Sequence, residues 1–466
     1  MIGEKQSLHN PVQRSLVQVL FIGVFMAALD SAIVGPVLPA LRAAFDIDNR
    51  TVGLLSTVFS LSSMCSTALM AYFSDRHGRR PVYLASVALF AIGSLCIAAA
   101  PSFDLLLVSR AIQGIGAGGI APVASAVIGD VFTAERRGRI LGLIGATHGM
   151  AFVLGPPLAT ALTSTLGWRW LFLVNIPVAL VVLWLGARSL PSQRSDAAPG
   201  PIDTSGIAVT LLFLLCLVMG ISRLPDSATG LLLWPWFLAA SGVLLAALVA
   251  IEKRQAQPLV PIDLFENRQL AFVYVLTLGV GLSMGGIVFL TTIATLAYGV
   301  SIEYAGLALL PLVLCSMVGS MAAGRLLNRL GARNMVVFGF GLLTLGYLQS
   351  VVPQTGFTAF VVASVLIGIG VGVVVSGALR SIAIDEAPPA LRGSAQGLIN
   401  IFNAVGTLLA VTCISAIADF EGGGLTGFSH AYLALGLSML VMLVVAFGLK
   451  RKSTDSVTKP ASSVGT

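Results

Sequence analysis

Charge is scarce in this chain of 466 residues. Asp, Glu, Lys and Arg make up 10% of it, whereas soluble domains carry about 25%. Polar stretches long enough to fold as a soluble domain are also missing; hydrophobic residues make up 56%, and the mean hydropathy is +0.95. The apolar runs are continuous rather than alternating, which excludes a β-barrel and indicates helices that cross a lipid bilayer. The sequence therefore predicts an all-α, multi-pass membrane protein.

Cysteine is also rare. The five cysteines each lie alone in an apolar run, without paired spacing or companion histidines. This pattern excludes a disulfide framework and a cysteine-based metal site, and we expect neither a metal nor a cofactor. The glycine-rich segment 114–119 has no preceding strand and lies in an apolar run, so a nucleotide site is not expected. No nucleophile–base set is visible, which disfavours a membrane enzyme or sensor.

Basic residues exceed acidic ones, giving a net charge of +7, but they are scattered through short loops, so we expect no nucleic-acid partner. Membrane topology explains them better. Of the 27 Lys and Arg residues, 22 fall on the side of the termini, four on the opposite side and one inside a span. The positive-inside rule then places both ends in the cytoplasm. We expect the chain to lie in the cell (inner) membrane. This count rests on fourteen predicted spans, at 15–40, 51–72, 81–100, 104–132, 140–165, 170–189, 205–222, 231–251, 269–298, 303–325, 334–352, 357–384, 395–418 and 430–449.

The chain resembles itself at offsets of 253 to 255 residues, as transporter folds with internal repeats do. In this register Asn328 faces Asp75, and Asp385 faces Asp130. We therefore predict two six-helix bundles separated by two extra helices. The aligned segments are 71–80 with 324–333, 114–118 with 368–372, and 137–144 with 392–399. The predicted units are an N-terminal bundle (1–189), linkers with two extra helices (190–267), a C-terminal bundle (268–450) and a disordered cytoplasmic tail (451–466).

Three motifs in the first half carry a family resemblance. The segments are AYFSDRHGRRP at 71–81, RAIQGIGAGG at 110–119 and LDSAIVGPVLP at 29–39. They resemble motifs of the major facilitator superfamily and, within it, of the fourteen-helix drug:proton antiporters; segments 168–177 and 258–268 are similar to that group too. The matching residues are Asp30, Pro39, Asp75, Arg76, Gly78, Arg79, Arg80, Pro81, Arg110, Gln113, Gly114, Gly116 and Gly118.

The resemblance implies a secondary active transporter with the major facilitator fold, not an enzyme. It implies proton-coupled efflux of lipophilic drugs or toxic compounds, cations among them, by alternating access. The expected partners are a small-molecule substrate, protons and the lipid bilayer, and the expected functional unit is a monomer. The alternative is a transporter that exports or imports one specific metabolite. The helix 5 antiporter motif leaves it open, because Ala159 and Thr160 stand in place of its glycine pair.

Two charged residues lie deep inside predicted spans, Asp30 and Arg110, and an ionisable residue in a membrane is by default a functional candidate. Their repeat partners, near Ser283 and at Ser364, carry no charge. Burial favours the neutral form of a carboxylic acid and a nearby cation favours the ionised form. We therefore expect Asp30 to couple proton movement to substrate movement, with Arg110 and its neighbour Gln113 in the same cavity.

Structural roles remain open for both charges. Asp30 can instead pack or bond locally, in a helix that Gly35, Pro36 and Pro39 are expected to break. Arg110 can be a structural tie to backbone carbonyls. The functional hypothesis requires both residues to affect transport rather than folding alone.

By resemblance, Asp75 and Arg79 belong to a cytoplasmic charge cluster that locks the two halves in the outward-facing state, with Asp130 as a further partner. Asp75 is also expected near Ser394, at the positive N-terminus of the span at 395–418. Orientation in the membrane alone accounts for Arg76 and Arg80. The predicted gating motif consists of Asp75, Arg76, Gly78, Arg79, Arg80 and Asp130.

Other residues carry weaker hypotheses. Gly155 and Pro156 survive from the helix 5 motif and form a hinge, by resemblance, or an ordinary kink. His148, one turn earlier, is expected to pack rather than titrate. Asn400 and Asn403 share a helix face and contact either substrate or a neighbouring helix. Apolar candidates for a drug pocket, which fit a packed core better, are Phe25, Met26, Phe59, Met64, Phe152, Phe289 and Phe402.

Overall fold

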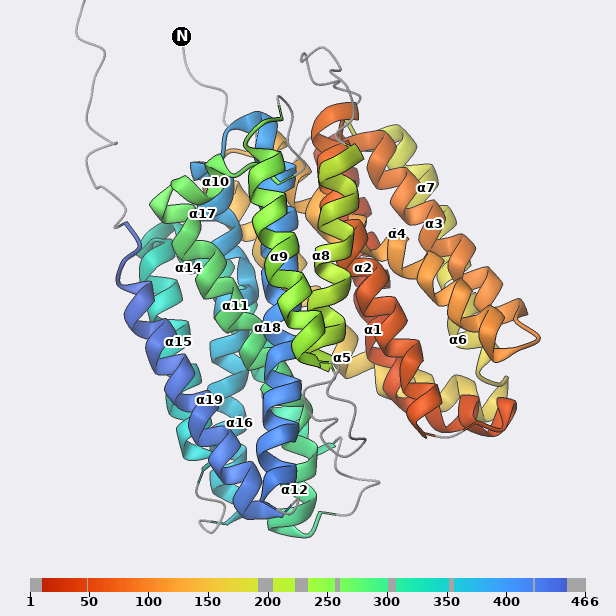
Figure 1. Cartoon of the computed structure of the whole chain (residues 1–466), viewed down its shortest axis with the longest axis vertical. Coiled ribbons are helices and arrows are strands. Elements are labelled where there is room, and N and C mark those ends of the chain that lie inside the picture. Colours follow the sequence, from red (N-terminus) through yellow and green to blue (C-terminus); the bar gives the residue numbers. More distant parts are fainter. Residues whose placement is uncertain are drawn as a thin grey trace, which may run out of the picture.

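The computed structural model describes residues 11–47, 49–191, 204–222, 234–255, 260–300, 307–351, 356–421 and 424–450. Every regular element within these ranges is a helix, and the helices run side by side in one elongated bundle (Figure 1). The all-helical prediction is confirmed. The predicted tail at 451–466 and most of the first predicted linker lie outside the described residues.

The helix bounds follow the predicted spans. The N-terminal half contains α1 (Pro11–Phe45), α2 (Asn49–His77), α3 (Arg79–Ala99), α4 (Phe103–Val131), α5 (Ala134–Thr165), α6 (Arg169–Leu173) and α7 (Asn175–Ser189). The extra pair is α8 (Thr204–Ser222) and α9 (Trp234–Glu252). The C-terminal half contains α10 (Asp263–Glu266), α11 (Arg268–Val288), α12 (Leu290–Tyr298), α14 (Leu310–Leu330), α15 (Ala332–Gln349), α16 (Phe357–Val373), α17 (Leu379–Glu386), α18 (Arg392–Phe420) and α19 (Leu425–Ala446).

Among the described residues, eleven helical segments are long and apolar enough to cross a membrane. The other predicted spans are helical as well and correspond to α5, α8 and α15. α8 falls short because its apolar stretch, Ser205–Ile221, is short. Length and composition therefore establish a multi-pass membrane protein.

α1 contradicts one expectation about proline. It continues unbroken from Pro11 to Phe45 through Gly35, Pro36 and Pro39, so the predicted break in this helix is wrong. α5 likewise continues through the Gly155–Pro156 motif. Membrane helices tolerate such residues because neighbouring helices and local adjustments satisfy the freed backbone groups. Asp30 thus lies within a continuous helix.

The interruptions occur elsewhere. The predicted span at 269–298 divides at Phe289 into α11 and α12. The predicted span at 357–384 contains a π-helical turn at Val374–Ala378, between α16 and α17. Within that turn Gly377 has a φ of 106°, outside the helical range. Single π-helical turns are frequent at functional sites, and this one faces α5 of the other half.

The two halves repeat each other's packing. α1 packs on α5 as α11 packs on α18, and α3 packs on α4 as α15 packs on α16. The loop glycines repeat too: Gly78, before α3, has φ 95° and ψ 159°, and Gly331, before α15, has φ 80° and ψ 155°. A side chain would be strained at such a φ, which explains why both positions are glycine. The sequence repeat is therefore also a repeat of local structure.

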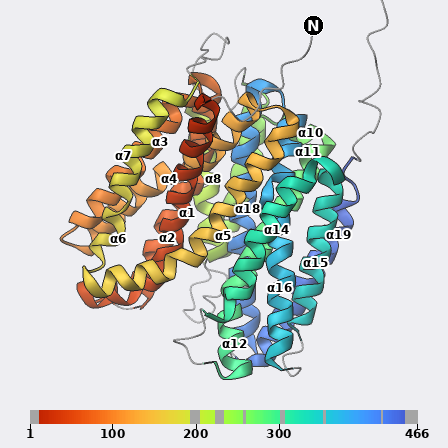
Figure 2. The ribbon, with the colours of Figure 1, turned by 180° about the vertical axis from the view of Figure 1, so that it is seen from behind.

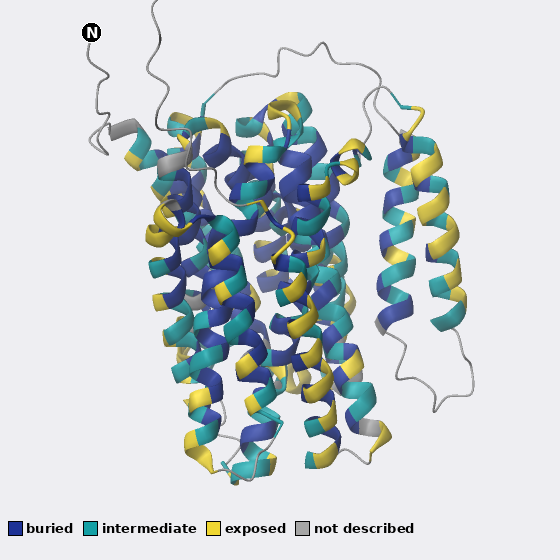
Figure 3. Ribbon diagram, turned by 90° about the vertical axis from the view of Figure 1, so that its left-hand side faces the viewer, coloured by how far each residue is buried: buried dark blue, intermediate teal, exposed yellow. Residues whose placement is uncertain are grey.

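The halves meet along two seams. α2 lies against α18, and α5 lies against α14. α8 covers the α2–α18 seam, where its Leu214 and Val218 pack with Met64, Ala68 and Ile401. α9 packs on α8, and Figure 3 shows this pair beside the main body of helices. The α5–α14 seam lies on the other side of the molecule, in the foreground of Figure 2.

Candidate functional site

A buried ion pair joins α1 to α4 in the N-terminal half. Arg110 Nη1 donates a hydrogen bond to Asp30 Oδ2 at 2.6 Å. The side chain of Arg110 is 1% exposed and that of Asp30 is 0% exposed. An isolated charge in such a place is costly, and each charge here compensates the other. The structure thus brings together two residues that the sequence singled out separately.

Polar side chains from three further positions complete this network. Gln113 Nε2 donates to Asp30 Oδ1 and to Ser94 Oγ, both at 2.8 Å. Asn175 Nδ2, at the start of α7, donates to Asp30 Oδ1 at 3.2 Å. Arg110 also donates to Gln113 Oε1. Both carboxylate oxygens of Asp30 are therefore hydrogen-bonded. We call Asp30, Ser94, Arg110, Gln113 and Asn175 the Asp30 network.

Arg110 has a second stabilising neighbour. Its guanidinium carbon lies 4.0 Å from the centroid of the Phe59 ring on α2. A desolvated cation–π contact contributes about 2 kcal/mol. Phe59 and Gln113 can therefore hold the guanidinium when Asp30 is released from it.

The matching positions of the C-terminal half carry no charge. On α11 and α15, the Tyr347 hydroxyl donates to the Ser283 carbonyl oxygen at 2.5 Å and lies 3.1 Å from the Ser283 hydroxyl. On α16, the Ser364 hydroxyl is buried without a hydrogen-bond partner. A tyrosine–serine contact thus stands where the N-terminal half has its ion pair. Among the described residues, a buried ion pair at these matched positions is present in the N-terminal half alone.

Asp75, at the end of α2, contacts the start of α18 in the other half. Its Oδ1 accepts from the backbone N–H of Gly393 at 2.9 Å, and its Oδ2 accepts from the backbone N–H and the hydroxyl of Ser394 at 2.7 and 2.8 Å. The first amides of a helix lack partners within the helix and attract negative charge. Arg79 donates to the same carboxylate and, at 2.8 Å, to Ser74 Oγ. Asp75 therefore contacts both halves at once.

Asp130, at the end of α4, is the second carboxylate of this group. It accepts from Arg79 Nε at 2.9 Å and from Arg392 Nη1, the first residue of α18, at 3.1 Å. Beside it, Arg137 on α5 donates to the Gly129 carbonyl at 2.9 Å and pairs with Asp385 on α17. We call this group the Asp75 cluster and its end of the molecule, where α10 and α17 are labelled in Figure 1, the Asp75 face. The cluster consists of Asp75, Arg79, Asp130, Arg137, Asp385 and Arg392.

The remaining residues of the predicted gating motif lie beside the cluster. Arg76 Nη1 donates to the Tyr72 hydroxyl at 3.2 Å, and Arg80 donates to the Ala187 carbonyl on α7. Gly78 forms the tight connection between α2 and α3. These residues shape and anchor the loop within the N-terminal half, whereas Asp75 reaches the other half.

Gly155 allows a close crossing of α1 and α5. A Cβ atom at this position would lie 2.7 Å from the Cβ of Ala32, two residues after Asp30. Any side chain here would therefore push α5 away from the helix that carries the Asp30 network. The side chains of Pro156, His148 and Phe152 lie outside the described residues, so their predicted roles remain predictions.

Several predicted pocket residues have other neighbours. Asn400 accepts from Arg380 Nη2 at 2.6 Å, and Arg380 Nη1 also reaches Ser125 Oγ of the N-terminal half at 3.3 Å. Phe402 stacks on Tyr274, with the ring centroids 5.4 Å apart. Asn400 is thus part of a contact between helices, and Phe402 belongs to the packed core of the C-terminal half.

Sequence reasoning missed several participants. Asn175 lies in segment 168–177, which resembles a family motif, but nothing in the pattern distinguished this residue. Arg137 and Arg392 begin the matching segments RGRILGLI and RGSAQGLI, and this repeated Arg-Gly pair is a signal that could have identified both. Among the described residues, no three His, Cys, Asp or Glu side chains lie together in a way that would hold a metal ion.

Comparison with known proteins supports the fold and the family. A family model described as Major Facilitator Superfamily matches residues 20–411 and also 273–464. An uncharacterised MFS-type transporter of Bacillus subtilis (strain 168), YfiU, is 33% identical over 414 residues, which are 86% of this chain and 79% of that protein. The multidrug transporter protein MdtP of the same organism is 27% identical over 418 residues, which are 88% of this chain and 76% of that protein.

Among solved structures, the human organic anion transporter MFSD10 superposes with a TM-score of 0.72. The match covers 94% of this chain and 100% of that chain, at 20% identity. A likeness at this identity concerns the fold, and it agrees with the arrangement expected from the sequence motifs.

Proposed function

Since the chain belongs to the major facilitator superfamily, we propose that it is a proton-driven exporter of lipophilic compounds, cations among them, that works by alternating access. The chain is a transporter rather than an enzyme. Drug export is supported by a relative that is named as a multidrug transporter and matches 88% of this chain. It is also supported by the motifs around Asp30, Asp75 and Arg110, which resemble those of drug:proton antiporters.

The proposed topology has fourteen spans with both ends in the cytoplasm. It adds α5, α8 and α15 to the eleven apolar segments, and it rests on the 22 basic residues that then share the side of the termini. The Asp75 face is cytoplasmic in this arrangement, and the membrane is the cell (inner) membrane. The moving units are the bundles 1–189 and 268–450, and the protein works as a monomer.

The observation that carries the proposal is the Asp30–Arg110 pair, fully buried in the N-terminal half and replaced by uncharged residues in the other half. In the proposed cycle, a proton replaces Arg110 on the carboxylate of Asp30. Gln113 and the Phe59 ring then hold the guanidinium. A carboxylate that alternates between these partners can exchange protons on one side of the membrane for substrate on the other.

The Asp75 cluster supplies the second proposed element, a latch on the cytoplasmic side. Its contacts between halves run from Asp75 to Ser394, from Asp130 to Arg392 and from Arg137 to Asp385. With the latch formed, the halves are held together at the Asp75 face, and the proposed state is outward-facing. Opening toward the cytoplasm requires these contacts to separate.

Transport by the purified protein in liposomes tests the proposal. We expect a lipophilic cation such as ethidium to be moved when a pH gradient is imposed, and to stop moving when a protonophore is added. Asp30→Asn should abolish the response to the gradient at equal protein abundance. The control is Asp104→Asn, which removes an exposed carboxylate in the first turn of α4, outside the network.

Two outcomes would contradict this function. Ethidium movement that ignores the pH gradient would exclude proton coupling, and full activity of Asp30→Asn would remove Asp30 from the mechanism. Transport of one metabolite with no drug transport would favour the alternative of a specific carrier, which the incomplete helix 5 motif at Ala159 and Thr160 supports.

A further inference from the structure

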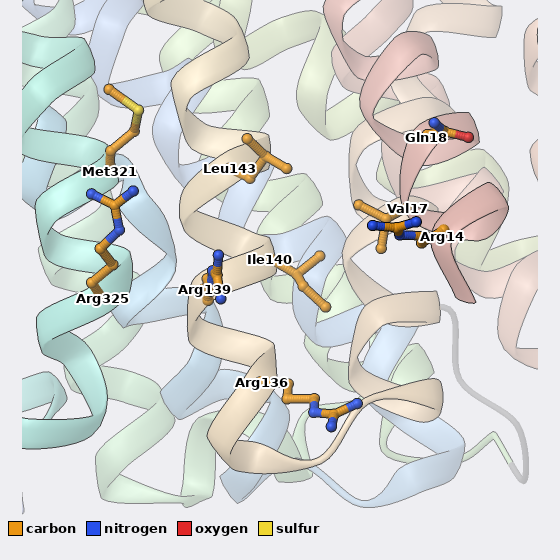
Figure 4. A pocket seen from close by; sticks show the side chains of 9 residues that line it. All are labelled: Arg14, Val17, Gln18, Arg136, Arg139, Ile140, Leu143, Met321 and Arg325. Atoms are coloured by element: carbon orange, nitrogen blue, oxygen red, sulfur yellow. The ribbon is translucent and has the colours of Figure 1, made fainter. Parts of the chain in front are cut away.

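Four arginines line a groove at the α5–α14 seam. The groove has a volume of about 700 Å³, and its side chains come from α1, α5 and α14 (Figure 4). Arg14 lies in the first turn of α1, Arg136 and Arg139 in the first two turns of α5, and Arg325 near the end of α14. All four are thus at the Asp75 face. We call this site the arginine groove; its lining is Arg14, Val17, Gln18, Arg136, Arg139, Ile140, Leu143, Met321 and Arg325.

No acidic side chain lines the groove, and none of its four arginines has an ion-pair partner among the described residues. Arg14, Arg139 and Arg325 are exposed, and Arg136 is half-buried. The positive charges of arginines that line the same groove repel one another unless an anion lies between them. Because no described carboxylate pairs with these arginines, the arginine groove favours binding of an anion.

The sequence repeat shows which charge is missing. In the α2–α18 seam, Asp75 accepts hydrogen bonds from Gly393 and Ser394 at the start of α18. The repeat places Asn328 of α14 at the position of Asp75, opposite the start of α5. Asparagine has no charge, while the basic residues around it are kept. At this matched position, one seam thus carries a carboxylate and the other an uncharged amide.

The arginine groove also has the chemistry of a lipid site. Its arginines lie toward the Asp75 face, whereas Leu143 and Met321 lie one turn or more deeper along α5 and α14 (Figure 4). A phospholipid has the same order, with a charged phosphate at the membrane surface and acyl chains below. The α8–α9 pair packs against the opposite seam, and among the described residues no further helix pair covers the side of the molecule with this groove.

We propose that the arginine groove binds the phosphate headgroup of an anionic phospholipid from the leaflet at the Asp75 face. The lipid phosphate accepts hydrogen bonds from Arg139 and Arg325, where arginine is suited to bidentate recognition. The negative charge of the phosphate then has the same role in the α5–α14 seam as the Asp75 carboxylate has in the α2–α18 seam. The acyl chains lie against the apolar side chains of α5 and α14. The site does not depend on the identity of the transported substrate.

Native mass spectrometry of the purified full-length protein tests the site. The probes are phosphatidylglycerol, which is anionic, and phosphatidylcholine, which has no net charge. The variant is Arg139→Gln/Arg325→Gln, and the matched control is Lys253→Gln/Arg254→Gln, which removes two exposed charges in the turn after α9. We expect the groove variant to bind phosphatidylglycerol about 25-fold more weakly, roughly fivefold for each arginine. The control should bind it like the unmodified protein.

A second variant tests the same site without removing an arginine. Gln18→Glu adds a carboxylate to the groove lining and should also weaken binding of phosphatidylglycerol. Equal retention of phosphatidylglycerol by the unmodified protein and both groove variants would overturn the proposal. So would displacement of the lipid by millimolar inorganic phosphate, because the groove would then be a site for free anions.

Discussion

Asp75 and Ser394 are 319 positions apart and belong to different halves, yet the carboxylate accepts two hydrogen bonds from this serine, at 2.7 Å from its backbone amide and at 2.8 Å from its hydroxyl. The acid caps a helix to which it is not adjacent in sequence. Since the first amides of α18 have no partner within the helix, the cap is stabilising only while α2 and α18 stay together. Separation of the halves at the Asp75 face must break it.

We expect Asp75→Asn to weaken this contact by about 1.5–3 kcal/mol, the range for hydrogen bonds to charged groups. The equilibrium should shift at least tenfold toward separated ends of α2 and α18. Pulsed EPR distances between spin labels at these two ends, in lipid nanodiscs, measure the shift. Asp46→Asn, an exposed carboxylate just after α1, is the control. Identical distance distributions for Asp75→Asn and the unmodified protein would exclude a latch.

The ion pairs of the Asp75 cluster should differ in strength. Asp130 is 30% exposed where it meets Arg392, whereas Asp385 is 52% exposed where it meets Arg137. Exposed pairs contribute about 0–1 kcal/mol because water screens them. Double-mutant cycles on thermal stability should therefore give a larger coupling for Asp130→Asn with Arg392→Gln than for Asp385→Asn with Arg137→Gln. The reverse order would show that Arg137 has the dominant contact.

The Asp30 network makes a prediction about folding. Arg110→Ala should destabilise the protein by about 3–5 kcal/mol, because it leaves a buried carboxylate without its partner. The double variant Asp30→Asn/Arg110→Gln should lose less, since no charge remains unpaired. Thermal unfolding in detergent, followed by circular dichroism, compares the variants. A double variant less stable than Arg110→Ala would contradict this account of the pair.

The α1–α5 crossing can be tested by exchanging its contacts. Gly155→Ala places a Cβ atom 2.7 Å from that of Ala32 and should destabilise the protein by about 1–3 kcal/mol. Adding Ala32→Gly to the same chain should restore the melting temperature, because the colliding atom is removed. Gly242→Ala on α9, where nothing lies within 4 Å, serves as control. If Ala32→Gly does not restore the melting temperature of Gly155→Ala, the loss of stability does not come from the contact between these two residues.

Hydropathy and the internal repeat were sufficient to predict an all-helical membrane protein with helices near each predicted span. The proximity of Asp75 to Ser394 was expected from the family resemblance of the loop, together with the preference of a carboxylate for the N-terminus of a helix. The continuity of α1 through Pro36 did not follow, because the compensating contacts come from other helices.

The Asp30 network was only partly predictable. Buried charges such as Asp30 and Arg110 stand out in an apolar chain, whereas Asn175 and Ser94 are ordinary polar residues in their segments. Their role arises from the packing of α7 against both α1 and α3, which no local pattern contains. The arginine groove could not be predicted from the sequence either, because its arginines come from three helices that are distant in sequence.

The position of the α8–α9 pair makes the two flanks of the molecule mechanically unequal. In the proposed cycle, rocking of the halves separates both seams, and at the α2–α18 flank it must also move an attached pair of helices. At the α5–α14 flank only lipid has to be displaced. In the proposed cycle, the composition of the membrane next to the α5–α14 flank therefore contributes to the energy of the movement.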